Sequence, residues 1–240
     1  MGDIYSTEDR ATLGRATGDA LLAVGTMLRS KRSDPAEARA IGIVTQMAGE
    51  LILGSVDLAG KTNYYASLAL HRQLIEVFHL LDFFANDSSG AARWLGTSDG
   101  DFASPSSEFK PSALRRAGGF DGTQYSQHCG LAGHPRPAGR VVLPEGEAWV
   151  GPILATSQVT GRDISILLED LVLCDALLHA RTTYLAAGRA VDALGRTDNL
   201  AERLAPTWAD LETWAREDPG ALIMPRRAST HSLSRLILGD

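Results

Sequence analysis

The chain contains very little cysteine. Only Cys129 and Cys174 occur among its 240 residues, which is too few for a disulfide framework and fits a reducing compartment. The N-terminal stretch MGDIYSTEDR carries acidic residues and lacks the apolar run of a signal peptide. No stretch approaches the roughly 18 uncharged apolar residues that a spanning helix needs. We therefore expect a soluble cytoplasmic protein with no membrane partner.

The chain also contains little lysine and has no excess of positive charge. The 23 cationic residues include only three lysines, and the formal net charge is −6. Proteins that bind polyanions in general carry a basic surface, so the overall charge does not favour that class of function. The strong preference for arginine is typical of a GC-rich genome, and it does not by itself indicate phosphate recognition.

Strand patterns are nearly absent. Apart from a short VVL at 141–143, no stretch favours a strand, whereas helical periodicity covers most of the chain. The predicted fold class is all-α, a helical bundle of four to five main helices. Ser6 or Thr7 is expected to cap the first helix, and Asp34 followed by Pro35 to open the second. The helices are expected at residues 7–30, 35–60, 63–85, 157–194 and 199–216.

Residues 88–152 differ in composition from the helices on either side. They are rich in Gly, Ser and Pro, which predicts one or two short helices within a long irregular insertion. We predict a single all-α domain over residues 1–216 that includes this insertion. Residues 217–240 read as a loosely packed C-terminal tail.

The third helix carries a narrow polar stripe on an otherwise apolar surface. Arg72, Glu76 and His79 share one side of this helix. Because buried polar groups need partners, such a stripe is expected to face a groove or a partner helix. The simpler alternative is a solvated Arg72–Glu76 pair that contributes a few tenths of a kcal/mol.

The long fourth helix shows a second pair of this kind. Asp175 and His179 fall within its apolar stripe, one turn apart. A carboxylate four residues before a histidine can hold the imidazole tautomer. The alternative is a buried Asp–His pair that satisfies itself.

The insertion contains the loop sequence YSQHCGLAGHP at 125–135. Its histidines, His128 and His134, are six residues apart, which does not match a structural zinc pattern. The sequence predicts no metal ligand and no cofactor here. Gly130 and Gly133 favour a sharp turn. We interpret the loop as a lid that brings Tyr125, His128 and His134 over the stripe of the third helix.

Three segments together resemble an uncharacterised group of bacterial all-helical proteins with an R-x-x-x-E central helix and a Tyr…His…GHP loop. They are ALHRQLIEVFHLL at 69–81, AARWL at 91–95 and YSQHCGLAGHP at 125–135. That group is distantly similar to the HEPN class, several members of which are metal-independent ribonucleases of toxin and phage-defence systems. Arg72-Gln73 followed by His79 fits the HEPN spacing. The resemblance implies a site at Arg72, Glu76, Tyr125, His128, His134 and Pro135.

Three functions remain open at this point. The leading interpretation is an interaction or regulatory module with a polar Arg/Glu/His site, linked to bacterial defence by the resemblance. The second is a HEPN-like ribonuclease in which Arg72 stabilises the charged transition state and His79 or His134 acts as general acid or base. RNA and a second copy of the chain are the partners considered.

The third function is a carboxylate–histidine metal protein. Glu76 and His79 form one Glu-x-x-His motif, which di-iron bundles use twice. The second copy is missing, so Asp175 and His179 would have to take its place with a different spacing.

Overall fold

The computed structural model describes residues 5–30, 34–97, 107–120, 122–134, 143, 161–195 and 200–218. Within these ranges every regular element is helical and no strand occurs, so the predicted all-α class is confirmed. The main helices are α1 (Thr7–Leu28), α2 (Ala36–Gly60), α3 (Tyr64–Asn86), α7 (Gly161–Asp192) and α8 (Leu200–Glu217). Three short helices are α4 (Ser88–Leu95), α5 (Pro111–Gly118) and α6 (Thr123–His128).

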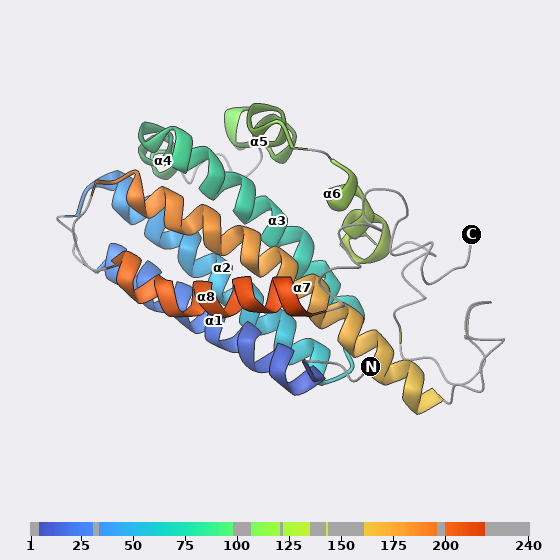
Figure 1. Cartoon of the computed structure of the whole chain (residues 1–240). Coiled ribbons are helices and arrows are strands. Elements are labelled where there is room, and N and C mark those ends of the chain that lie inside the picture. Colours follow the sequence, from blue (N-terminus) through green and yellow to red (C-terminus); the bar gives the residue numbers. More distant parts are fainter. Residues whose placement is uncertain are drawn as a thin grey trace.

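Four of the long helices lie side by side and bury one core. Helix α2 packs on α1, α3 and α7, and α7 packs on α1 and α3 (Figure 1). Helix α8 packs on α1 and α7. Helix α4 packs on α2 and α3, while α5 and α6 pack on α3. The short helices therefore line one side of the bundle rather than entering it.

Local sequence signals account for several helix ends. Ser6 accepts a hydrogen bond from the Asp9 backbone N–H, and the Asp9 carboxylate accepts one from the Ser6 backbone N–H, which forms a capping box. Asn63 caps α3 through the Ala66 N–H. The second helix begins one residue later than expected, because Pro35 occupies its N-cap position. Asp34 is therefore not the cap.

The buried face of α2 does not coincide with its largest apolar residues. The buried apolar positions of this helix include Ile41, Val44, Ala48 and Ile52. Met47 is 46% exposed. Small residues on this face set the interhelical distance, so the most buried positions are not always the largest ones.

Two glycines allow the backbones of α1 and α2 to approach closely. A Cβ on Gly42 would lie 2.8 Å from the Gly25 carbonyl oxygen and 2.8 Å from the Leu28 Cβ. A Cβ on Gly25 would lie 2.6 Å from the Gly42 carbonyl oxygen. These distances are shorter than van der Waals contact, so any side chain here must push the helices apart.

Helix α2 is the one helix of the described residues that is long and apolar enough, by length and composition, to cross a membrane. Core helices of globular proteins meet the same criterion. In this fold α2 packs against α1, α3, α4 and α7, which cover much of its apolar surface. Its composition is therefore explained by its position in the bundle.

A buried ion pair fixes the end of α8 to the rest of the domain. The Arg10 guanidinium on α1 donates to both carboxylate oxygens of Asp218 at 2.7 and 3.0 Å, and to Asp170 on α7 at 2.9 Å. The Trp214 indole N–H donates to the same Asp218 carboxylate at 2.6 Å. Bidentate geometry makes this a strong contact. It shows that residues up to 218 belong to the folded domain.

Other predictions for the C-terminal half and the insertion have mixed outcomes. The described part of the insertion contains three short helices where one or two were expected, together with a 3₁₀ turn at Ser107–Phe109. Pro206 lies inside α8. The short strand was expected at 141–143, and of these residues the structure describes only Leu143, which is in a bend. Pro135 and the tail from residue 219 lie outside the described residues.

We predict that Gly42→Ala destabilises the protein. The added methyl group collides with the α1 backbone, and overpacking of this kind costs about 1–3 kcal/mol. The matched control is Gly60→Ala in the same helix, where a Cβ meets nothing within 4 Å. Chemical denaturation should show a lower free energy of unfolding for Gly42→Ala alone. Equal stabilities of the two variants would contradict the close approach.

Candidate functional site

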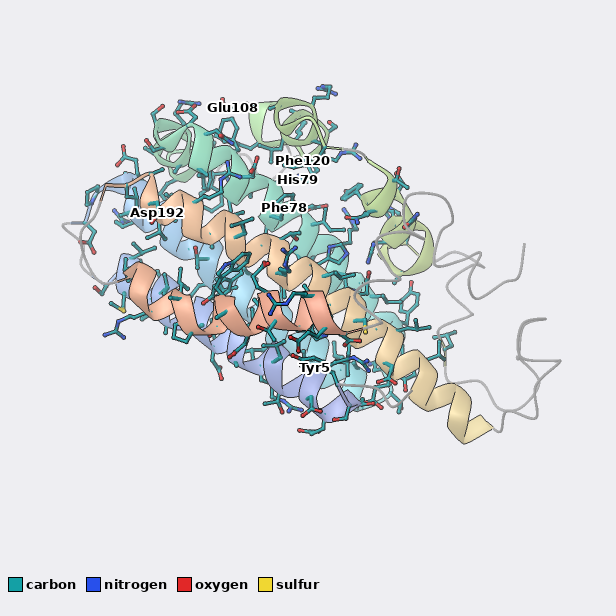
Figure 2. The ribbon with its side chains drawn as sticks, viewed as in Figure 1. Tyr5, Phe78, His79, Glu108, Phe120 and Asp192 are labelled. Atoms are coloured by element: carbon teal, nitrogen blue, oxygen red, sulfur yellow. The ribbon has the colours of Figure 1, made fainter. Side chains whose placement is uncertain are left out.

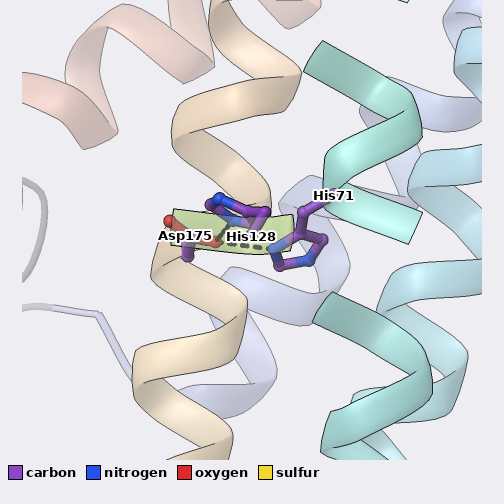
Figure 3. Close-up of side chains that lie close together, drawn as sticks. All are labelled: His71, His128 and Asp175. Carbon is purple, nitrogen blue, oxygen red and sulfur yellow. Dashed lines mark hydrogen bonds and ion pairs between the residues drawn. The ribbon is translucent and has the colours of Figure 1, made fainter. Parts of the chain in front are cut away.

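Four ionisable side chains meet in the interior of the bundle. His71 lies on α3, His128 ends α6, and Asp175 and His179 lie one turn apart on α7. All four are buried, with exposures between 0% and 6%. Figure 3 shows His71 and His128 converging on Asp175 from different helices. Residues up to 108 positions apart are therefore brought together by the fold.

The Asp175 carboxylate is the centre of this cluster. Its Oδ2 atom lies 2.6 Å from His71 Nδ1 and 2.7 Å from His128 Nε2. Its Oδ1 atom lies 3.6 Å from His179 Nε2, which is too long for a hydrogen bond. One buried carboxylate thus binds two imidazoles and faces a third.

The surroundings of His128 define its protonation. Nε2 faces the Asp175 carboxylate, and Nδ1 lies 2.9 Å from the Gln124 carbonyl oxygen. Both oxygens are acceptors only, so both ring nitrogens must carry hydrogen. His128 is therefore an imidazolium paired with the ionised Asp175.

His71 is connected to a chain of hydroxyl groups on its other side. Its Nε2 lies 2.6 Å from Ser55 Oγ, which lies 2.8 Å from Ser67 Oγ. Ser67 Oγ in turn lies 2.9 Å from the Ser55 carbonyl oxygen. When His71 is neutral and donates its Nδ1–H to Asp175, its Nε2 accepts a hydrogen bond from the Ser55 hydroxyl. That hydroxyl in turn accepts a hydrogen bond from Ser67. The proton order of this chain depends on which nitrogen of His71 carries hydrogen.

His179 has an unsatisfied nitrogen that faces the cluster. Its Nε2 is buried and has no hydrogen-bond partner among the residues that the structure describes. A buried nitrogen without a partner is costly, and such groups in native proteins call for an explanation. The nearest acceptor in the cluster is Asp175, at the non-bonding distance given above.

The pKa shifts agree with this assignment of charges. Burial alone would raise the pKa of Asp175, but the His128 charge and the hydrogen bonds from His128 and His71 hold this pKa well below its usual range. Burial lowers the pKa of His71, and it lowers that of His179 to about 3 with help from His128. The pKa of His128 is raised, because Asp175 outweighs the effect of burial. The cluster thus holds one anion, one cation and two neutral imidazoles.

The same arrangement has the dimensions of a metal site. One ligand atom from each of His71, His128 and Asp175 lies within 4.8 Å of the others. The three imidazole centres are separated by 4.9, 5.7 and 6.0 Å. Imidazoles bound to one tetrahedral ion at about 2.1 Å place their ring centres about 5 Å apart. Three histidines and a carboxylate are a common donor set for transition metals.

Ser55, His71 and Asp175 also have the connectivity of a catalytic triad. The hydroxyl bonds one imidazole nitrogen and the carboxylate bonds the other. Ser55 is only 1% exposed, however, and its hydroxyl is already bonded to Ser67. A substrate carbonyl has no access to this oxygen, so the arrangement does not support nucleophilic catalysis.

The polar stripe predicted on α3 forms a separate site nearer the surface. Arg72 and Glu76 are paired at 3.0 Å, and each side chain is just under one-third exposed. The Tyr125 hydroxyl donates to Glu76 at 2.9 Å and accepts from Arg72 at 3.2 and 3.3 Å. The predicted approach of the loop to this stripe is therefore correct for Tyr125.

The other residues predicted for that site lie elsewhere. His128 points into the bundle and joins Asp175. His134 is exposed, and no hydrogen bond or ion pair joins it to Arg72 or Glu76 among the residues that the structure describes. The expected single site therefore separates into a surface network and a buried cluster. Residues on successive turns of α6 face these two different environments.

His79 occupies an aromatic environment on α3. Its ring centre lies 5.1 Å from that of Phe78 and 4.9 Å from that of Phe120 (Figure 2). Its Nδ1 is buried without a hydrogen-bond partner. Burial, with Arg115 nearby, lowers the pKa of His79 to about 4. A neutral, covered imidazole is poorly placed to exchange protons with a large substrate.

Sequence reasoning missed His71 and separated His128 from Asp175. His71 lies on the same face of α3 as Leu68 and Leu74, both of which are buried. A search for polar residues on apolar helix faces would have found it, as it found Asp175 and His179. The meeting of α3, α6 and α7 leaves no such local signal.

No family model, curated protein or solved structure matches this chain. The geometry of the described residues is therefore the basis for any functional proposal.

We predict that His79 makes the protein sensitive to acid. Its folded pKa of about 4 lies below the ordinary value of 6.5, so at intermediate pH the unfolded chain binds a proton that the folded chain does not. Its contribution to stability is complete above pH 6.5 and is lost as the pH falls towards 4. His79→Phe should reduce the loss of unfolding free energy between pH 7 and 4 by about 3 kcal/mol at most. If the unfolding free energies of wild type and His79→Phe depend on pH in the same way, the prediction is contradicted.

Proposed function

We propose that this protein binds one divalent transition-metal ion inside the bundle, through His71, His128, Asp175 and His179. The observation that carries the proposal is the convergence of three buried ligand groups, His71, His128 and Asp175, from three helices, with His179 buried beside Asp175. It retains Asp175 and His179 from the metal interpretation of the sequence and replaces Glu76 and His79 with other residues.

The outer partners of the histidines support the proposal. Histidines that bind a metal usually donate their second ring N–H to a carbonyl, carboxylate or water, which orients the ring. His128 Nδ1 faces the Gln124 carbonyl oxygen, and so is oriented with Nε2 towards the site. In a metal-bound state, His71 Nε2 would donate to the Ser55 hydroxyl. The Ser55 hydroxyl would donate to Ser67, and Ser67 would donate to the Ser55 carbonyl oxygen. All three of these hydrogen bonds are satisfied only when His71 Nδ1 is free to bind a metal and Nε2 carries hydrogen, or when His71 is charged.

A small adjustment would convert the hydrogen-bonded cluster into a coordination shell. Ligand atoms around a tetrahedral ion with bonds of about 2.1 Å lie about 3.4 Å from each other. His71 Nδ1 and His128 Nε2 lie 2.6 and 2.7 Å from Asp175 Oδ2, and His179 Nε2 lies 3.6 Å from Oδ1. These three carboxylate–imidazole separations need to change by less than about 1 Å to reach that value. The unsatisfied His179 nitrogen would gain a partner.

The donor set narrows the choice of ion. Imidazole favours zinc, iron, nickel and copper, whereas sites for magnesium and calcium use oxygen ligands. Three nitrogens and one carboxylate oxygen therefore fit Zn²⁺ or Fe²⁺ best. Cys174 is not included among the ligands, because it is buried beside Arg10 and burial raises the pKa of its thiol to about 12.

The proposed role of the ion is to hold the α6 segment on the bundle. A catalytic zinc site keeps a coordination position open, whereas a structural site is closed by four protein ligands. Here four protein ligands are available and all are buried. The site thus fits an interaction or regulatory module whose fold is completed by a metal. The ribonuclease alternative has less support, because Arg72 is bonded to Tyr125 and Glu76, while His79 is covered by Phe120.

We predict that the purified protein contains or takes up about one equivalent of Zn²⁺ or Fe²⁺. His128→Ala removes a ligand and should weaken affinity by more than about 100-fold, because loss of an outer partner alone costs 10–100-fold. His134→Ala is the matched control, as this exposed histidine lies six residues further along the same segment. Elemental analysis after gel filtration measures the metal content, and a competitive Co²⁺ titration measures the affinity.

Metal content that stays at one equivalent in His134→Ala and is lost in His128→Ala supports the buried site. Equal retention in both variants would show that the ion binds elsewhere. A wild-type protein that takes up no metal would contradict the proposal.

A further inference from the structure

The helix that carries His128 is too short to be stable by itself. Helix α6 spans Thr123–His128, six residues, and isolated helices shorter than about 12 residues are marginal in water. It continues into a π-helical turn at Cys129–Gly133, a rare form that is frequent at functional sites. The position of His128 must therefore depend on tertiary contacts of this segment.

The strongest polar contact between this segment and α3, outside the buried cluster, is made by Tyr125. Its hydroxyl group is held by three hydrogen bonds, one to Glu76 and two from Arg72. Tyr125 precedes His128 by three residues, so both side chains project from neighbouring positions of the same short helix. Arg72 also directly follows His71, the ligand that α3 supplies.

The end of the segment rests on the same arginine. A Cβ on Gly133 would lie 2.9 Å from Arg72 Cδ, so the glycine backbone packs directly on the arginine side chain. Ala132 is buried in the apolar cluster with Leu68 and Val172. The segment is thus fixed by packing contacts at Ala132 and Gly133 and by the polar contact of the Tyr125 hydroxyl.

From this geometry we propose that Tyr125 is a positioning residue for the metal site. Its hydroxyl, held between Glu76 and Arg72, sets the orientation of α6 so that His128 Nε2 points at Asp175. The inference rests on the proposed metal binding and identifies what controls its affinity. The three surface residues that sequence analysis placed in a catalytic site would then act on the buried site through His128.

The simpler alternative is a surface network that stabilises the fold and has no effect on the metal. The two alternatives differ because coupling between sites is reciprocal. If the Tyr125 contacts favour metal binding, metal binding must favour the Tyr125 contacts by the same factor. A purely structural network would change stability equally with and without metal.

The test uses Co²⁺, whose visible absorption reports binding directly. Tyr125→Phe removes only the hydroxyl and should weaken Co²⁺ affinity by about tenfold, the lower end of the range for groups that orient metal ligands. We expect the weaker affinity to result mainly from a faster loss of Co²⁺ to a chelator.

Tyr65→Phe is the matched control. Tyr65 lies on α3, is partly buried, and makes no hydrogen bond through its hydroxyl with any residue that the structure describes. This variant should release Co²⁺ at the wild-type rate. Hydrogen exchange gives a second measurement: Co²⁺ should slow exchange at residues 123–133 in wild type and less so in Tyr125→Phe.

The outcomes separate the two proposals. Weaker Co²⁺ binding and reduced protection in Tyr125→Phe, with a wild-type result for Tyr65→Phe, support the positioning role. Wild-type Co²⁺ affinity and release in Tyr125→Phe would overturn it while leaving the metal site intact. Absence of Co²⁺, Zn²⁺ and Fe²⁺ binding by the wild-type protein would overturn the proposed function and the positioning role together.

Discussion

The Asp175 carboxylate can remain ionised in the core only because imidazoles surround it. An isolated buried charge costs several kcal/mol, and removal of one partner from a buried pair is strongly destabilising. His71 and His128 donate to one oxygen of this carboxylate, and His128 also neutralises its charge. Since these residues lie on α3, α6 and α7, the requirement for compensation fixes how three helices meet. Much of the arrangement on this side of the bundle follows from that single group.

On the α1–α2 side of the bundle, a different kind of contact holds the helices together. Close backbone contact between α1 and α2 at Gly25 and Gly42 brings the helices together without large side chains. The buried Arg10–Asp218 pair then ties α1 to the end of α8. These contacts are complete in themselves, with satisfied charges and dense packing. The cluster around Asp175 differs, because His179 keeps a buried nitrogen without a partner. That contrast supports a ligand role for the cluster and a structural role for the other contacts.

Neighbouring residues in sequence divide between the buried site and the surface. His71 binds Asp175, while the next residue, Arg72, faces outward to Tyr125 and Glu76. A helix turns by about 100° per residue, so adjacent side chains meet different environments. The motif in α3 is therefore one segment with two functions. Its polar stripe contacts Tyr125 of α6, and its buried histidine contacts Asp175 in the interior.

The sequence alone determined the helical class, most helix boundaries and the presence of polar groups on buried faces, since these depend on local periodicity and capping. It also indicated that Tyr125 would approach Arg72 and Glu76. The partners of Asp175 were decided only by tertiary structure. His71 and His128 are far from Asp175 in the chain, and no local rule relates the rotation of α3 to the position of a six-residue helix. Packing of the whole bundle sets that relation, and with it the identity of the buried site.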